Sequence, residues 1–154
     1  MVVPDAPPVT GLSVRARSSD WLVLIVEDDP GTRLLYREAL TRAGFRVVDA
    51  HNGRQALDKV RESRPDAVVT DLAVPGMDGF EFCRALQQSP DTRDIPVLAV
   101  TGHPEYLDHP ERFRHTGILH VLVKPCDPDV LTREVWRLLD ERAAPPLDRP
   151  GAAE

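Results

Sequence analysis

Cysteines, aromatic residues and long apolar runs are all scarce in this chain. Its 154 residues include two cysteines, Cys83 and Cys126, and aromatic residues make up 5% of the sequence. Two cysteines without a framework spacing argue against a disulfide-stapled secreted domain and favour reduced thiols. No apolar run reaches the roughly 18 residues that a membrane span needs. The N-terminus is rich in proline and lacks the apolar stretch of a secretory signal. We therefore expect a cytoplasmic protein that does not contact membranes.

Basic residues are outnumbered as well. The chain carries 19 lysines and arginines against 25 acidic residues, which gives a net charge of −6 at pH 7. Proteins that bind nucleic acid directly usually present a basic face, so no direct nucleic-acid contact is expected. A composition that is 42% apolar and 29% charged is ordinary for a globular protein, and the length suits one domain.

Prolines cluster at the two ends of the chain, at positions 4, 7 and 8 and at positions 145, 146 and 150. Such segments bury little apolar surface, so residues 1–19 and 143–154 are predicted to be disordered arms. The folded domain is expected at residues 20–142. Because neither arm has room for an output domain, we expect the domain to act through other proteins.

Strand and helix patterns alternate five times within the expected domain. Short apolar runs predict strands at residues 21–26, 45–50, 67–70, 97–100 and 121–123. Helical patterns follow at residues 32–43, 53–63, 80–88, 104–116 and 128–142, and the fourth is the weakest because it is polar and holds two prolines. The first helix carries Leu34, Leu35, Ala39 and Leu40 at helical spacing, and Asp29, Asn52 and Asp127 precede three of the helices as N-caps. This alternation predicts an α/β fold with a parallel sheet and helices on both faces.

Four of the apolar runs, all but residues 45–50, end on polar residues and read as strands buried on both faces. Glu27, Asp28 and Asp29 follow the first of these runs, and Asp71, Thr101 and Lys124 follow the other three. Ligands of an open parallel sheet bind beyond the carboxyl ends of its strands, so these side chains are expected to converge there.

Three carboxylates in one place need a counter-charge. Two like charges about 5 Å apart repel by roughly 3 kcal/mol at an effective dielectric near 20. Glu27, Asp28 and Asp71 are therefore expected to hold a hard divalent cation, and Mg²⁺ prefers such oxygen ligands. For Asp29 the capping role is the favoured interpretation.

Asp71 is the predicted nucleophile of this group. A carboxylate can attack a phosphoryl group and carry it as an acyl phosphate. The charge on the transferring oxygens needs fixed counter-charges, which Mg²⁺ and Lys124 would supply, and the Thr101 hydroxyl can donate to a phosphate oxygen. These three residues, Asp71, Lys124 and Thr101, are the predicted catalytic set.

Four segments of the chain resemble the signature segments of receiver domains from two-component response regulators. They are residues 26–30, 100–101, 123–125 and above all 70–79, which holds the specific pattern Asp-Leu-x-x-Pro-Gly-Met-Asp-Gly. The resemblance spans roughly residues 22–141. It implies a flavodoxin-like, doubly wound five-stranded sheet in strand order 2-1-3-4-5. It also implies that the carbonyl of Ala73 is a metal ligand with Asp28 and Asp71, and that Lys124-Pro125 is a cis peptide.

The resemblance implies a signalling role. A sensor histidine kinase or a histidine phosphotransfer protein would donate the phosphoryl group to Asp71. A downstream protein would read the result, or the group would be passed on in a phosphorelay. We expect a monomer or weak homodimer that is not an enzyme.

The chain departs from the family at two positions, and two other functions stay open. Val121 stands where the family has an inward-swinging tyrosine or phenylalanine, and Cys126 stands where it often has phenylalanine. The lost aromatic would suit a phosphate-independent pseudo-receiver that only binds partners. An aspartyl-phosphate phosphatase of the dehalogenase type would need a second aspartate where this chain has Ala73. Without a large residue at position 121, activation is expected to move residues 102–117 instead.

Overall fold

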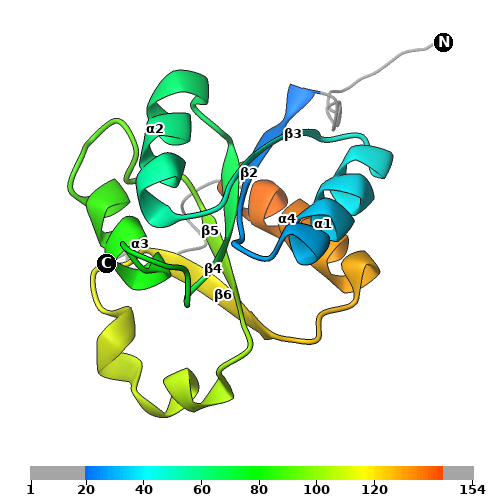
Figure 1. The fold of residues 1–154 in the computed structure, drawn as a ribbon. Coiled ribbons are helices and arrows are strands. Elements are labelled where there is room, and N and C mark those ends of the chain that lie inside the picture. The colour runs from blue at the N-terminus through cyan, green and yellow to red at the C-terminus, as the bar shows by residue number, and fades with distance from the viewer. Residues whose placement is uncertain (1–19, 144–154) are drawn as a thin grey trace, which may run out of the picture.

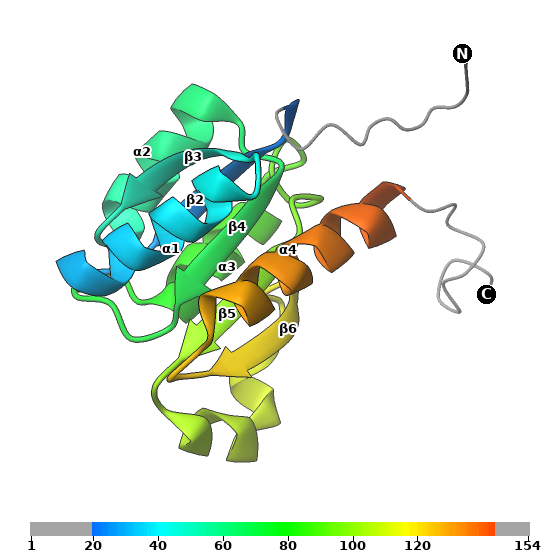
Figure 2. The same ribbon diagram turned by 90° about the vertical axis from the view of Figure 1, so that its right-hand side faces the viewer.

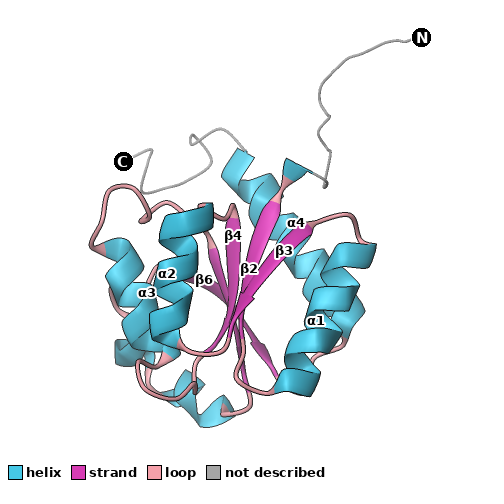
Figure 3. Cartoon of the chain, turned by 45° about the horizontal axis from the view of Figure 1, so that its top comes forward, coloured by secondary structure: helices cyan, strands magenta, loops and turns pink. Residues whose placement is uncertain are grey.

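The computed structural model describes residues 20–143, and its centre is a parallel β-sheet (Figure 3). The strands are β2 (Leu22–Val26), β3 (Arg46–Ala50), β4 (Ala67–Asp71), β5 (Val97–Thr101) and β6 (Ile118–Val123). They lie in the order β3-β2-β4-β5-β6, and every neighbouring pair is parallel. Counted along the chain, this is the order 2-1-3-4-5, so the predicted topology is confirmed. The predicted arms at residues 1–19 and from residue 144 onward lie outside the described residues.

Helices cover both faces of this sheet (Figures 1 and 2). They are α1 (Pro30–Arg42), α2 (Gly53–Ser63), α3 (Gly79–Gln87) and α4 (Pro128–Ala143). Helices α1 and α4 pack on one face, and α2 and α3 pack on the other (Figure 1). The last of them includes Ala143, which the sequence pattern had assigned to the arm. Within the described residues, no helix combines the length and the apolar character that crossing a membrane requires.

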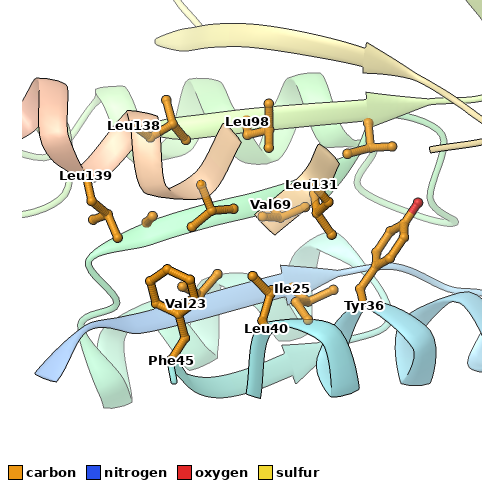
Figure 4. Packing of buried hydrophobic residues seen from close by; sticks show 13 residues of the cluster. Val23, Ile25, Tyr36, Leu40, Phe45, Val69, Leu98, Leu131, Leu138 and Leu139 are labelled. Atoms are coloured by element: carbon orange, nitrogen blue, oxygen red, sulfur yellow. The ribbon is translucent and has the colours of Figure 1, made fainter. Parts of the chain in front are cut away.

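The three central strands form the core of the molecule. Every residue of β2, β4 and β5 is buried, because each strand has neighbours on both sides and helices on both faces. Figure 4 shows the layer between the sheet and helices α1 and α4, where Val23, Ile25, Leu40 and Leu131 meet. For β6 the prediction of burial on both faces was wrong: it lies at the sheet edge and exposes Leu119.

Helix α1 is rotated relative to the predicted apolar stripe. Leu34 and Leu35 are 54% and 46% exposed, whereas Tyr36, Ala39 and Leu40 are buried. Tyr36 and Leu40 lie four residues apart on one helical face, and both belong to the cluster beneath the helix. Because Tyr36 and Leu40 pack in this cluster, their side of the helix faces the sheet, and Leu34 and Leu35 face solvent.

Residues 104–116 do not form the predicted α-helix. They form two short 3₁₀ helices, η2 (Pro104–Asp108) and η3 (Pro110–Phe113). Pro110 lacks the backbone N–H that would continue a helix, and His109 before it is held at φ −128° and ψ 69°, outside the helical region. Aromatic contacts with Phe80 of α3 hold this segment against the sheet, at centroid distances of 5.3 Å to Tyr106 and 5.1 Å to Phe113.

Local capping signals set the starts of the helices. The carboxylate of Asp29 accepts from the Thr32 N–H at 2.8 Å, and the Asn52 side chain accepts from the Gln55 N–H at 2.8 Å. Asp127 accepts from the Asp129 N–H at 2.8 Å where α4 begins. The predicted N-caps are therefore confirmed, and the bounds of α2 match the prediction at both ends.

Candidate functional site

The carboxyl ends of four strands meet at one edge of the sheet. Strand β4 ends at Asp71 and β5 at Thr101, while Glu27 and Lys124 directly follow β2 and β6. Backbone hydrogen bonds extend the ladders by one step here: Glu27 N–H donates to Ala50 O at 3.0 Å and Lys124 N–H to Thr101 O at 2.8 Å. The sheet itself thus fixes the starting points of these side chains.

Lys124 bridges two acids at this edge. Its ammonium nitrogen Nζ lies 2.8 Å from Glu27 Oε1 and 2.8 Å from Asp71 Oδ2. The side chains of Glu27 and Asp71 are 2% and 8% exposed, and that of Lys124 is 24% exposed. Charge-assisted hydrogen bonds of this length are strong when water is largely excluded. The ammonium therefore fixes the direction of both carboxylates.

The protonation states follow from burial and from this bridge. Burial acts to lower the pKa of Lys124, but hydrogen bonds to Asp71 and Glu27 outweigh it and raise the pKa above its usual value. Burial raises the pKa of Glu27, although the hydrogen bonds from Lys124 and the Asp29 N–H act to lower it. Lys124 therefore keeps its positive charge, and a further cation nearby would stabilise the ionised form of Glu27.

Three carboxylates at this edge could hold a metal ion. One oxygen each of Glu27, Asp28 and Asp71 lies within 4.8 Å of the other two. With Lys124 as the adjacent cation, the four side chains carry a formal charge of −2, which one divalent ion would neutralise. Asp28 is exposed, so the cluster is open to solvent on that side. The oxygen-only donor set fits a hard ion such as Mg²⁺.

Ala73 and Thr101 lie next to the acids through the backbone. The Ala73 N–H donates to Asp71 Oδ1 at 3.0 Å, which holds the chain after β4 close to the carboxylate. Thr101 is fully buried, and its hydroxyl oxygen accepts from the His103 N–H at 3.0 Å. Because the hydroxyl accepts in this bond, its hydrogen can be donated to an incoming oxygen.

Two glycines shape the turn after Asp71, each for a different reason. Gly76 has φ +74°, a left-handed conformation that favours glycine. Gly79 is required by close packing instead. A Cβ at Gly79 would lie 2.3 Å from the carbonyl oxygen of Asp71. Asp78, at the start of α3, forms a capping box with Glu81.

The two positions that depart from the receiver pattern are filled by other contacts. Val121 is half-buried and packs, as Tyr106 and Phe113 do, against the buried cluster of Leu72, Phe80 and Ala99. Cys126 is half-buried on the opposite face, in the cluster that contains Tyr36. Burial raises the pKa of the Cys126 thiol.

One residue at this edge was missed from the sequence. Arg33 of α1 donates from Nη1 to the carbonyl oxygen of Glu27 at 2.9 Å. The signal that could have found it is its spacing, since residue 33 lies in the first turns of a helix that begins directly after the acids. A long side chain there can reach back to the preceding loop.

Comparisons with known proteins show which family this sequence resembles. The family model for the response regulator receiver domain matches residues 23–135. The sporulation initiation phosphotransferase F of Bacillus subtilis is 36% identical over 117 residues, which cover 76% of this chain and 92% of that protein. The transcriptional regulatory protein AfsQ1 of Streptomyces coelicolor is 34% identical, and the match spans half of its length.

Solved structures of receiver domains have a similar fold. The chemotaxis response regulator CheY4 of Vibrio cholerae has a TM-score of 0.72 and 31% identity, over 77% of this chain and 98% of that one. The receiver domain of the sensor histidine kinase PA1611 from Pseudomonas aeruginosa has a TM-score of 0.70 and 27% identity, over 78% and 98% of the two chains. That structure holds a magnesium ion in its active-site cleft.

Proposed function

The chain belongs to the family of response regulator receiver domains, and from this membership we propose that Asp71 is its phosphoacceptor. The domain is a phosphorylation-dependent signalling switch of a two-component system. One observation carries the assignment to Asp71: its carboxylate lies 2.8 Å from the Lys124 ammonium, beside Glu27 and Asp28, at the open edge of the sheet.

The chemistry is a transfer between two nucleophiles. A carboxylate oxygen of Asp71 forms a bond to the phosphorus of a phosphohistidine, and the bond from phosphorus to the imidazole nitrogen breaks. The electron pair of that bond returns to the imidazole. Lys124 holds its ammonium against a phosphoryl oxygen, and the Thr101 hydroxyl donates to another.

Mg²⁺ is the proposed cofactor. The carboxylates of Glu27, Asp28 and Asp71 and the carbonyl of Ala73 would hold it. When bound, it supplies positive charge to the phosphoryl oxygens. The formal charge of −2 on the four clustered side chains supports a divalent ion, as does the magnesium ion in the related PA1611 domain.

The proposed donor is a sensor histidine kinase or a histidine phosphotransfer protein. The phosphotransferase among the relatives supports a place in a phosphorelay. A cytoplasmic location, output through a downstream protein and the absence of nucleic-acid and membrane contacts complete the proposal. We propose a signalling module rather than an enzyme, because Ala73 stands where an aspartyl-phosphate phosphatase needs its second acid. The proposed oligomeric state is a monomer or weak homodimer.

Intact mass spectrometry after incubation with acetyl phosphate and Mg²⁺ tests this proposal. We expect the wild type to gain the mass of one phosphoryl group and Asp71→Asn to gain none. Asp78→Asn is the matched control, since asparagine also caps helices and Asp78 lies outside the acid cluster. Excess chelator should prevent the gain.

Two results would count against the proposal. Phosphorylation of Asp71→Asn would show that the acceptor is another residue. A wild type that gains no mass but keeps its fold would favour a phosphate-independent interaction module.

A further inference from the structure

Arg33 ties helix α1 to the loop that carries the first two acids of the site. Its Nη1 donates to the carbonyl oxygen of Glu27 at 2.9 Å, and a longer contact of 3.5 Å reaches the carbonyl of Asp28. Its own backbone N–H donates to Asp29 O at 2.9 Å, within the first turn of the helix. Side chain and backbone of one residue thus contact all three residues of the acidic run.

The carbonyl of Glu27 needs such a partner. The strand register of β2 ends at Val26; beyond it the Glu27 N–H still donates to Ala50 O, whereas the Glu27 carbonyl accepts from Arg33. Glu27 is 2% exposed, which leaves little water to satisfy the oxygen. An unpaired carbonyl there would cost free energy or would turn, and turning it would swing the carboxylate of the same residue away from Lys124.

Arg33 therefore acts on the acids in two opposed ways. By fixing the carbonyl of Glu27, it fixes the backbone from which the carboxylates of Glu27 and Asp28 project. By its positive charge, it disfavours a second cation nearby. Positioning and charge predict opposite effects on metal affinity when the side chain is removed, so the two can be separated by experiment.

We propose that Arg33 is a positioning residue for the divalent cation, which holds the loop of Glu27 and Asp28 so that both carboxylates face Asp71. This inference rests on the proposed function, because it concerns the same metal. The contact is made through backbone oxygen, so the effect is carried by geometry and not by direct ligation.

The test is Mg²⁺ binding by isothermal titration calorimetry, on the full chain and its Arg33→Met variant. Outer partners of metal ligands typically change affinity by 10- to 100-fold, and we expect the Kd to rise about tenfold. Arg37→Met is the matched control. It removes the same charge one turn further along α1, where Arg37 pairs with Asp49 at 3.0 Å, and we expect it to stay within about twofold of the wild type.

Two further measurements separate positioning from damage to the fold. Thermal melting without metal should give one cooperative transition for each variant, which shows that both are folded at the temperature of the titration. In phosphorylation by acetyl phosphate, Arg33→Met should need a higher Mg²⁺ concentration to reach its half-maximal rate. Its rate at saturating Mg²⁺ should stay within about twofold of the wild type. If Arg33→Met does not fold, Arg33→Lys carries the test, because it keeps the charge but not the planar guanidinium, and we expect about threefold weaker binding.

The outcomes are distinct. Unchanged or tighter Mg²⁺ binding by Arg33→Met, beside a wild type that binds, overturns the positioning role and leaves the proposed function intact. A wild type that does not bind Mg²⁺ contradicts the proposed metal site and this inference together. A Kd raised in Arg33→Met but not in Arg37→Met supports it.

Discussion

Replacing Lys124 with methionine removes the ammonium that Glu27 and Asp71 share. Each acid oxygen lies 2.8 Å from Nζ, so the two oxygens are at most about 5.6 Å apart. At that separation two carboxylates repel by about 3 kcal/mol at an effective dielectric near 20. Because both acids are nearly buried, water screens them little. We expect the free energy of unfolding of Lys124→Met to be about 2–3 kcal/mol lower than that of the wild type at pH 7.5 without divalent cations.

The loss of stability in Lys124→Met should become smaller as the pH falls. Burial already raises the pKa of Glu27 above its ordinary value of 4.5, and Lys124 acts to lower it. Without the lysine, the folded-state pKa rises further above the unfolded value, so the folded variant binds more protons. Its stability therefore increases as the pH falls toward 4.5. The raised pKa of Lys124 lies far above this window, so its contribution to the wild type is constant there. The difference between variant and wild type should shrink on acidification.

Urea denaturation in the presence of a chelator measures the effect, with tryptophan fluorescence as the signal. Lys59→Met, on α2, is the control for loss of a lysine at a distance from the acids. The reasoning is refuted if Lys124→Met matches the wild type within about 0.5 kcal/mol at pH 7.5. It is also refuted if the difference widens as the pH falls.

Two more predictions concern the turn after Asp71 and the output segment. Gly79→Ala should lower the free energy of unfolding by about 2 kcal/mol or more, because its Cβ would lie 2.3 Å from the Asp71 carbonyl oxygen. Gly31→Ala, whose nearest contact would be 3.5 Å, is the control in the same urea denaturation, and equal losses would contradict the packing argument. Binding of beryllofluoride with Mg²⁺ should change hydrogen exchange in η2 and η3, which contain no buried residue, and leave α2 unchanged. Unchanged exchange from residue 102 to residue 124, with proven ligand binding, would place the output face elsewhere and favour a plain relay role.

Local signals in the sequence predicted most of the fold. The N-caps Asp29 and Asn52 mark helix starts through short-range hydrogen bonds, which the sequence shows directly. The strand order came from the family resemblance, since spacing alone does not order parallel strands. The role of Asp71 as phosphoacceptor stays a prediction that mass spectrometry tests, and the roles of Thr101 and Lys124 in the transfer stay predictions as well.

The errors arose where tertiary contacts decide between local alternatives. The run from Leu34 to Leu40 holds two overlapping apolar stripes, and packing of Tyr36 on the sheet chose the one that the pattern did not favour. Glycine is required at position 79 by a carbonyl eight residues earlier in the chain, a contact that no local pattern shows. Arg33 was missed although its spacing places it near the acids, because its role depends on where the end of a long side chain lies.

The bridge made by Lys124 also affects when a newly synthesised chain becomes able to accept a phosphoryl group. Its two partners lie 97 and 53 positions earlier in the sequence. During synthesis the acids therefore leave the ribosome long before the ammonium that orders them. A nascent chain that ends before β6 has the proposed acceptor, Asp71, but not its counter-charge. Because contacts of such separation form only when the sheet closes, phosphorylation would mark a chain whose fifth strand is in place.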